Sequence, residues 1–176
     1  RAVGCTRKRI CHRIAEIGEN IAVKLAKYDW LMRVDGDDIL HPDRTRLSAR
    51  AILKYPDAIT VAGNLIPFSD IVKAVSNPAD EDIMYQSFCR NDFTEFKAPR
   101  ELSWWGGTMC INRKIFDIFG NLHEDCSVLD DTLFATRALM LGKMVIAQNA
   151  IFLYYRRHSS NVSSSNGGSS NSISEL

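Results

Sequence analysis

The segment 30–38 constrains the fold most strongly. Trp30–Val34 is a short, mostly apolar run that ends abruptly in the acidic sequence Asp35-Gly36-Asp37-Asp38. A buried strand that runs into a polar loop gives this pattern. A helical pattern follows at 42–54, opened by Pro42, and a second apolar run follows at 58–63. The order strand, helix, strand is typical of a right-handed βαβ unit, in which ligands bind beyond the C-terminal strand ends. The acidic loop is expected at that edge.

The rest of the chain extends this α/β pattern. Helical spacing or helix-ending glycines predict helices at 7–28, 113–119 and 130–141, and an acidic first turn at 80–82 predicts one at 78–89. Apolar runs predict strands at 108–111, 144–147 and 150–155. These elements predict a mixed, mainly parallel sheet flanked by helices, within one domain over 1–158. The Ser/Asn/Gly-rich segment 159–176 is expected to be a disordered tail, since it holds too few apolar residues to form a core.

Composition excludes several classes of function. The 22 Lys and Arg residues balance 21 Asp and Glu residues, so the chain lacks the basic excess of a general nucleic-acid binder. The longest apolar stretch, 58–68, is interrupted and falls short of the roughly 18 residues of a membrane span. The five cysteines have the spacing of neither a metal knuckle nor a disulfide framework. We therefore expect a reducing, cytoplasmic location, with peripheral attachment to a membrane left open.

Three carboxylates crowd the acidic loop. Asp35, Asp37 and Asp38 repel one another, and a bound divalent cation relieves that repulsion. Oxygen ligands favour Mg²⁺ or Mn²⁺, and a site with few protein ligands leaves positions for substrate phosphates. An EF-hand is excluded, because Arg46 stands where its loop needs a Glu. A solvated acidic turn remains the alternative.

A second acidic pair, Asp130 and Asp131, opens the predicted helix 130–141. The helix dipole favours the ionised form of a carboxyl group at this end, which suits a general base. An ordinary helix N-cap is the competing interpretation.

Two further clusters are candidates for ligand contacts. Arg156, Arg157 and His158 follow the last predicted strand, where they could hold a diphosphate and complete a metal site; a solvated sheet edge is the alternative. The sequence Trp104-Trp105-Gly106-Gly107 combines aromatic rings that suit a sugar face with glycines that allow close approach to the backbone. Core packing of at least one Trp is the alternative.

The order of these motifs resembles the family 2 glycosyltransferases, inverting enzymes of the GT-A fold. The resemblance runs from Asn20, through the block 30–44 with its DxD-type Asp35-Gly36-Asp37, to the terminal Tyr155-Arg156-Arg157-His158 segment with Asn161 and Ser163. Between them, Gly106 and Gly107 are similar to the family's acceptor-side loop. Asp130-Asp131 stands where the family usually has Glu-Asp.

The resemblance implies a transfer of sugar from a nucleoside diphosphate donor, a UDP-sugar being expected, to an acceptor hydroxyl of a glycan, a lipid-linked group or a protein. It implies a set of residue roles: metal binding (Mn²⁺ or Mg²⁺) by Asp35, Asp37 and His158; donor binding by Asp35, Asp38 and Arg156; a catalytic base at Asp131; and an acceptor pocket at Trp105, Gly106, Gly107 and Asp130.

One departure from the family concerns the start of the chain. Family members begin with a nucleotide-binding βαβ portion, and on this resemblance we expect the present sequence to start after it. We expect this polypeptide alone to bind nucleotide sugar poorly. Two other functions remain open: a non-catalytic carbohydrate- or partner-binding remnant of such an enzyme, and a GT-A-like nucleotidyltransferase that attacks at phosphorus.

Overall fold

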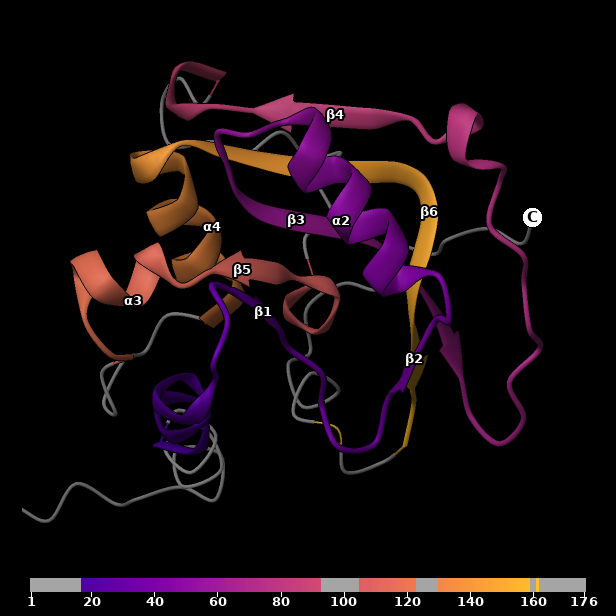
Figure 1. Cartoon of the computed structure of the whole chain (residues 1–176). Coiled ribbons are helices and arrows are strands. Elements are labelled where there is room, and N and C mark those ends of the chain that lie inside the picture. Colours follow the sequence, from indigo (N-terminus) through magenta and orange to yellow (C-terminus); the bar gives the residue numbers. More distant parts are fainter. Residues whose placement is uncertain (1–16, 93–104, 123–129, 159–160, 162–176) are drawn as a thin grey trace, which may run out of the picture.

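A computed structural model describes residues 17–92, 105–122, 130–158 and 161, and its core is one mixed, curled β-sheet flanked by helices (Figure 1). The strand order is β1-β5-β3-β6-β2, and β4 pairs with β6 outside this path. Neighbouring residues of β3 point to opposite faces of the sheet. Val61 packs in one buried cluster with Leu47, and Ala62 packs in the other with Phe134. The α/β class expected from the sequence is therefore confirmed.

The predicted strand–helix–strand unit is present as β1 (Trp30–Met32), α2 (Arg44–Lys54) and β3 (Ala58–Phe68). However, β5 (Cys110–Asn112) lies between β1 and β3 and runs antiparallel to both. The two strands of the unit are thus parallel without being neighbours. Among the described strands only β3 and β6 pair in parallel, so the expectation of a mainly parallel sheet was wrong. A returning strand from a later part of the chain separates the two parallel strands.

The two strands predicted at 144–147 and 150–155 form one long strand, β6 (Lys143–Arg156). It bends after Ala147, where its register with β3 shifts (Figure 1). A Cβ atom on Gly63 would lie 2.5 Å from the Phe152 ring, so glycine at this position lets Phe152 pack into the bend. The first half of β6 pairs with β4 (Tyr85–Phe88), and the second half pairs with β2 (Ile39–Leu40). The bend carries the end of β6 to the acidic loop.

The helix predicted at 78–89 was wrong. Residues Asp80–Asp82 form a short 3₁₀ turn, and strand β4 follows it. From Ile83 to Ser87 the side chains alternate between more and less buried, which is the period of a strand. Asp80 does not open a helix; its carboxylate pairs with Arg46 and Arg50 of α2.

Residues 17–25 are helical and are fastened to the sheet by two side chains. Arg113 donates hydrogen bonds to the carbonyl oxygens of Val23, Ala26 and Tyr28, and so satisfies the C-terminal end of this helix. Asn20 exchanges two hydrogen bonds with the backbone of Leu122, at 3.0 and 2.9 Å. This helix therefore has a defined position beside β1.

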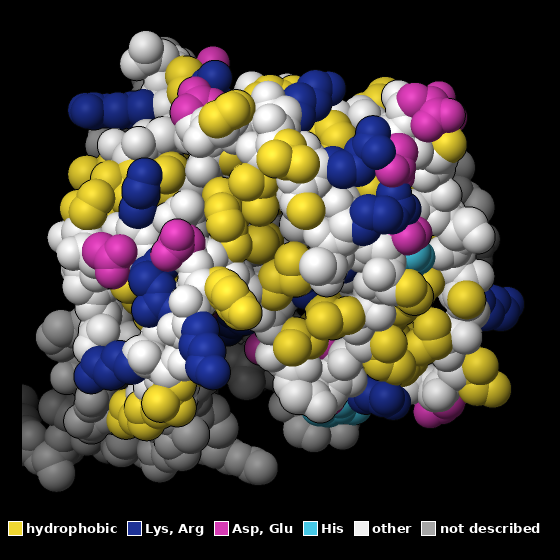
Figure 2. All heavy atoms as spheres, in the orientation of Figure 1, with side chains coloured by type: hydrophobic (Ala, Val, Ile, Leu, Met, Phe, Trp, Pro, Cys, Tyr) yellow, Lys and Arg dark blue, Asp and Glu magenta, His cyan; other side chains and the backbone are white. Residues whose placement is uncertain are grey.

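Helix α3 (Lys114–Phe119) is followed by Gly120, whose φ of 74° suits the end of a helix, and α4 spans Asp130–Leu141. Trp104, residues 7–16 of the first predicted helix, and the predicted tail except Asn161 lie outside the described residues. No helix in the described part is long and apolar enough to cross a membrane. Over the described residues on the face in Figure 2, basic and acidic side chains are interspersed.

Candidate functional site

The acidic residues form a tight turn after β1. The amide of Asp38 donates to the carbonyl oxygen of Asp35 at 3.1 Å, and strand β2 begins at Ile39 and pairs with the second half of β6. The turn is thereby held at the end of the sheet where β6 also ends. The predicted position of the acids beyond a strand end is confirmed.

The end of β6 docks onto this turn through three polar contacts. The Arg156 amide donates to Asp38 Oδ1 at 2.9 Å, and Arg156 Nε donates to the carbonyl oxygen of Asp37 at 2.9 Å. The His158 Nε2 and Asp37 Oδ2 atoms lie 2.7 Å apart. The Arg156 guanidinium also stacks 4.6 Å from the centre of the Phe68 ring. These contacts bring together two predicted site segments that are far apart in the sequence. Asp37 and His158, for example, are separated by 121 positions.

The three acids differ in exposure. The Asp37 side chain is 42% exposed and that of its partner His158 is 38% exposed, so a ligand can reach both. Asp38 Oδ2, by contrast, is buried and has no hydrogen-bond partner among the described residues. Burial raises the pKa of Asp38, and its hydrogen bond from the Arg156 amide opposes that rise. Asp38 therefore fixes the turn from inside, whereas Asp37 faces outward.

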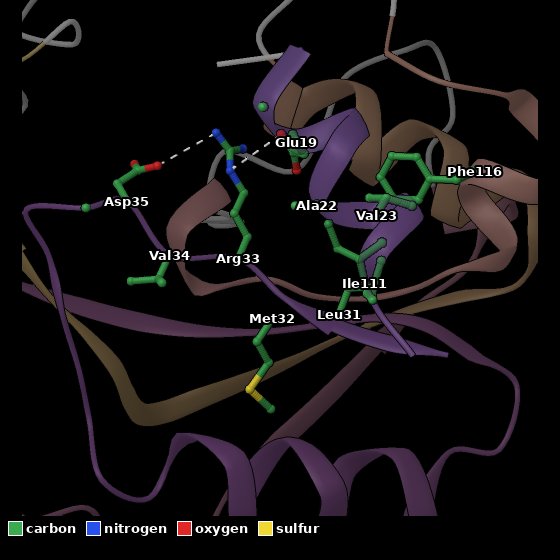
Figure 3. A pocket seen from close by; sticks show the side chains of 13 residues that line it. Glu19, Ala22, Val23, Leu31, Met32, Arg33, Val34, Asp35, Ile111 and Phe116 are labelled. Atoms are coloured by element: carbon green, nitrogen blue, oxygen red, sulfur yellow. Dashed lines mark ion pairs between the residues drawn. The ribbon is translucent and has the colours of Figure 1, made fainter. Parts of the chain in front are cut away.

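Asp35 lines a pocket, where its side chain points toward Arg33 (Figure 3). Its Oδ1 lies 3.9 Å from Arg33 Nη2, and Arg33 Nε lies 3.8 Å from Glu19. The pocket, of about 500 Å³, lies between the helical residues 17–25 and the end of β1. Its floor is apolar, with Leu31 and Phe116, and its rim is charged. Of the predicted metal ligands, the structure joins Asp37 and His158 and turns Asp35 toward the pocket.

The glycine segment forms a 3₁₀ turn, Gly106–Thr108, between the acidic turn and α4. A Cβ atom on Gly106 would lie 2.9 Å from Arg33 Nη1 and 3.3 Å from Asp131 Cβ. A Cβ atom on Gly107 would lie 3.6 Å from Asp38 Oδ2. Glycine at 106 therefore lets the start of α4 approach this turn closely, while Asp38 lies at ordinary contact distance from position 107. Trp105, which precedes this turn, is 48% exposed.

Asp131 lies in the first turn of α4 and is half-buried. Its Oδ1 accepts a hydrogen bond from the Thr132 amide at 2.7 Å, which is the amide of the next residue and not the N2 or N3 amide that an N-cap side chain binds. The side chain of Asp130 lies outside the described residues. Asp131 and the Arg33 guanidinium both lie close to Gly106.

The residues present fit a divalent cation held by few protein ligands. Among the described residues no group of three or more His, Cys, Asp or Glu side chains is arranged to hold a metal ion. Asp37 Oδ2 and His158 Nε2, 2.7 Å apart, have close to the spacing of adjacent ligands in an octahedral site, about 3 Å. Mg²⁺ commonly takes one or two protein ligands and completes its shell with water and substrate phosphates. A carboxylate–imidazole pair also suits Mn²⁺.

Sequence reasoning missed Arg33 and Arg44. Arg33 lies among Glu19, Asp35 and Gly106, and Arg44 is buried beneath the site. One signal was present in the sequence. Arg44 falls in the first turn of a predicted helix, where the helix dipole disfavours a positive charge, so another interaction must hold it there.

Comparison with known proteins shows the fold. No protein-family model matches the chain, and no curated protein matches its sequence. Crystal structures of residues 1–349 of TarS from S. aureus, a staphylococcal glycosyltransferase, are similar to this chain. One of them has a TM-score of 0.56 and 15% sequence identity, and the similarity covers 78% of this chain. The complex with UDP-GlcNAc has a TM-score of 0.58 and 16% identity, and the similarity covers 83% of this chain. The complex with UDP gives a TM-score of 0.57 at 12% identity. The chain spans only 38 to 40% of those structures. It shares a glycosyltransferase-like fold with them.

Proposed function

We propose that the chain carries the catalytic residues of an inverting, metal-dependent glycosyltransferase that moves a sugar from a UDP-sugar to an acceptor hydroxyl. The observation that carries this proposal is the meeting of Asp37 and His158, at 2.7 Å, near a glycine turn that also lies close to Asp131. The fold likeness to TarS, crystallised with UDP-GlcNAc and with UDP, supports the donor class.

The donor side comprises the acidic turn and the end of β6. Asp37 and His158 would hold Mn²⁺ or Mg²⁺, which when bound supplies a Lewis acid for the negative charge that grows on the departing diphosphate. Arg156 holds the backbone of the turn in place through its amide and Nε, and Asp38 anchors it. Asp35 overlooks the pocket of about 500 Å³, which would receive the nucleoside part of the donor.

The acceptor side comprises the glycine turn and the start of α4. Inversion requires attack from the face of the sugar away from the leaving group, so base and diphosphate must lie on opposite sides of the ring. Asp131 would accept the proton of the attacking hydroxyl, and its place close to Gly106, beside the glycine turn, supports that role. Trp105, exposed beside the turn, would contact the acceptor together with Gly106, Gly107 and Asp130.

The free cysteines Cys89 and Cys110 support a reducing, cytoplasmic setting for this reaction. The acceptor is a hydroxyl of a glycan, a lipid-linked group or a protein. The chemistry of the described site is the same for all three, because it acts on the hydroxyl alone.

The test is product analysis with a panel of UDP-sugars at millimolar concentration and Mn²⁺. A glycosyltransferase site is expected to release UDP, by slow transfer to water when no acceptor is present, and the Asp131→Asn variant is expected to lose this release. Asp57→Asn is the matched control, because Asp57 lies away from the site, where its carboxylate forms an ion pair with Lys143 Nζ at 2.9 Å. Release of a sugar 1-phosphate instead of UDP would indicate attack at phosphorus and contradict the proposal.

A further inference from the structure

A buried arginine lies beneath both halves of the site. Arg44, the first residue of α2, is only 1% exposed. Its Nη2 donates to the carbonyl oxygens of Arg33 and Met109, each at 2.9 Å, while its Nε and Nη1 have no hydrogen-bond partner among the described residues. Burial lowers the pKa of Arg44 to about 10, so it remains protonated at neutral pH. A buried, incompletely paired charge is costly, so its two contacts are expected to matter.

The two carbonyl groups belong to opposite halves of the site. Arg33 lies two residues before the acidic turn, and Met109 directly follows the glycine turn. The Arg33 amide also donates to the Met109 carbonyl oxygen, at 3.3 Å. One nitrogen atom of Arg44 therefore bridges the two backbone segments that carry Asp37 on one side and Gly106 on the other.

Arg44 is itself held firmly. Its amide donates to the carbonyl oxygen of His41 at 3.0 Å, and Leu47 and Ala51 of the same helix are fully buried against the sheet. The backbone that carries the guanidinium is therefore anchored independently of the two turns. From this fixed point the guanidinium is hydrogen-bonded to both turns.

We propose that Arg44 is a positioning residue that sets the separation between the acidic turn and the glycine turn, and hence between the metal pair and Asp131; its effect on catalysis rests on the function proposed above. Arg44 touches no reacting atom. A misplacement of about 1 Å between reacting groups can lower turnover on the order of 10²-fold, so a positioning role has a measurable consequence.

The test compares Arg44→Met, Arg44→Lys and Leu47→Ala by hydrogen exchange without any ligand. Arg44→Met is expected to speed exchange about tenfold in segments 33–38 and 105–109, with the first half of β6 unchanged. Arg44→Lys keeps one charged donor nitrogen and is expected to show a smaller change in exchange. It replaces Arg44→Met in the test if the methionine variant does not fold. Leu47→Ala leaves a cavity against the sheet without touching either carbonyl, so its changes are expected in α2 and β3.

Turnover of a UDP-sugar with Mn²⁺ gives the second readout. Arg44→Met is expected to lower kcat more than it raises the donor KM, with partial recovery in Arg44→Lys. Identical exchange patterns and identical kinetics in the Arg44 variants and Leu47→Ala would overturn the proposal. If the unmodified chain releases no UDP at all, the proposed function is contradicted but the positioning role of Arg44 is not. The hydrogen-exchange pattern then still decides whether Arg44 positions the two turns.

Discussion

The two sides of the candidate site are built by different physical means. The acidic turn is held to β6 by charged and hydrogen-bonded groups, with Arg156 reaching both Asp37 and Asp38. The glycine turn is positioned by the absence of side chains, since a Cβ atom on Gly106 or Gly107 would meet a neighbour at 2.9 Å. The donor side should therefore respond to changes of charge and the acceptor side to changes of size. Asp131, where charge acts on the acceptor side, is the exception.

The largest effect is expected at that exception. Asp131→Asn keeps the size of the side chain and an oxygen that can accept from the Thr132 amide, but removes the base. We expect kcat to fall by about 10² to 10⁴-fold with donor binding near that of the unmodified chain. Steady-state kinetics and calorimetry with a UDP-sugar measure the two quantities. An equal loss of turnover and donor binding would mean that Asp131 only caps α4.

The next effect tests the charge of the donor side. Asp37→Ala removes the partner of His158, and we expect activity to fall by about 10²-fold and to lose its dependence on Mn²⁺. The assay is UDP release at increasing Mn²⁺ concentration, with Asp57→Asn as the matched control of a charge far from the site. Asp37→Ala protein that is still stimulated by Mn²⁺ would refute the assignment of Asp37 as a ligand.

A size change on the acceptor side should separate the two glycines. The Cβ atom of Gly107→Ala would meet Leu153, which is 1% exposed, so we expect the free energy of unfolding to fall by about 1 to 3 kcal/mol. The Cβ atom of Gly106→Ala would meet the end of the Arg33 side chain, which can move, so we expect a loss below about 1 kcal/mol. Urea unfolding measures both. Equal losses would show that close packing does not distinguish the two positions.

The smallest effect concerns the pH dependence of stability. Burial raises the pKa of Asp38 above its usual 3.8, so its stabilising contribution is present below pH 4 and is lost as pH rises through the folded-state pKa. Arg46 lowers the pKa of Asp43, so that contribution is present above pH 4 and is lost as pH falls. Asp38→Asn is therefore expected to stabilise the fold slightly at pH 7, whereas Asp43→Asn destabilises it. Thermal unfolding from pH 3 to 7 measures the difference in stability between each variant and the unmodified chain. This difference is expected to change with pH in opposite directions for Asp38→Asn and Asp43→Asn; the same change in both variants would exclude this account.

The local elements around the acidic turn could be predicted from the sequence, because an apolar run, an acidic loop and Pro42 each act over a few residues. Strand β5 between β1 and β3 could not be placed in this way, since its pairing joins residues about eighty positions apart, such as Trp30 and Asn112. The acidic residues at 80–82 predicted the start of a helix, but the Asp80 carboxylate instead forms ion pairs with two arginines that are distant in the sequence. Long-range partners decided these elements.

The candidate site was predicted in its members more than in their roles. The sequence placed Asp35, Asp37 and Asp38 in one cluster, but only the three-dimensional contacts show that Asp38 turns inward and Asp35 turns toward Arg33. Burial of a side chain depends on which segment packs over it, and here that segment is the distant end of β6. The role of Arg44 could not be predicted for the same reason, because its burial and its contacts depend on segments that are distant in the sequence.

The central claim is that Asp37 and His158 together hold a divalent cation, and paramagnetic broadening by Mn²⁺ tests it most directly. Histidine ring signals would be followed by NMR as Mn²⁺ is added to the unmodified chain and to the Asp37→Ala and Asp57→Asn variants. We predict that substoichiometric Mn²⁺ removes the His158 ring signals in the unmodified chain and in Asp57→Asn, and that Asp37→Ala loses this response. Equal broadening of His158 in all three proteins, or none in any, would contradict the account.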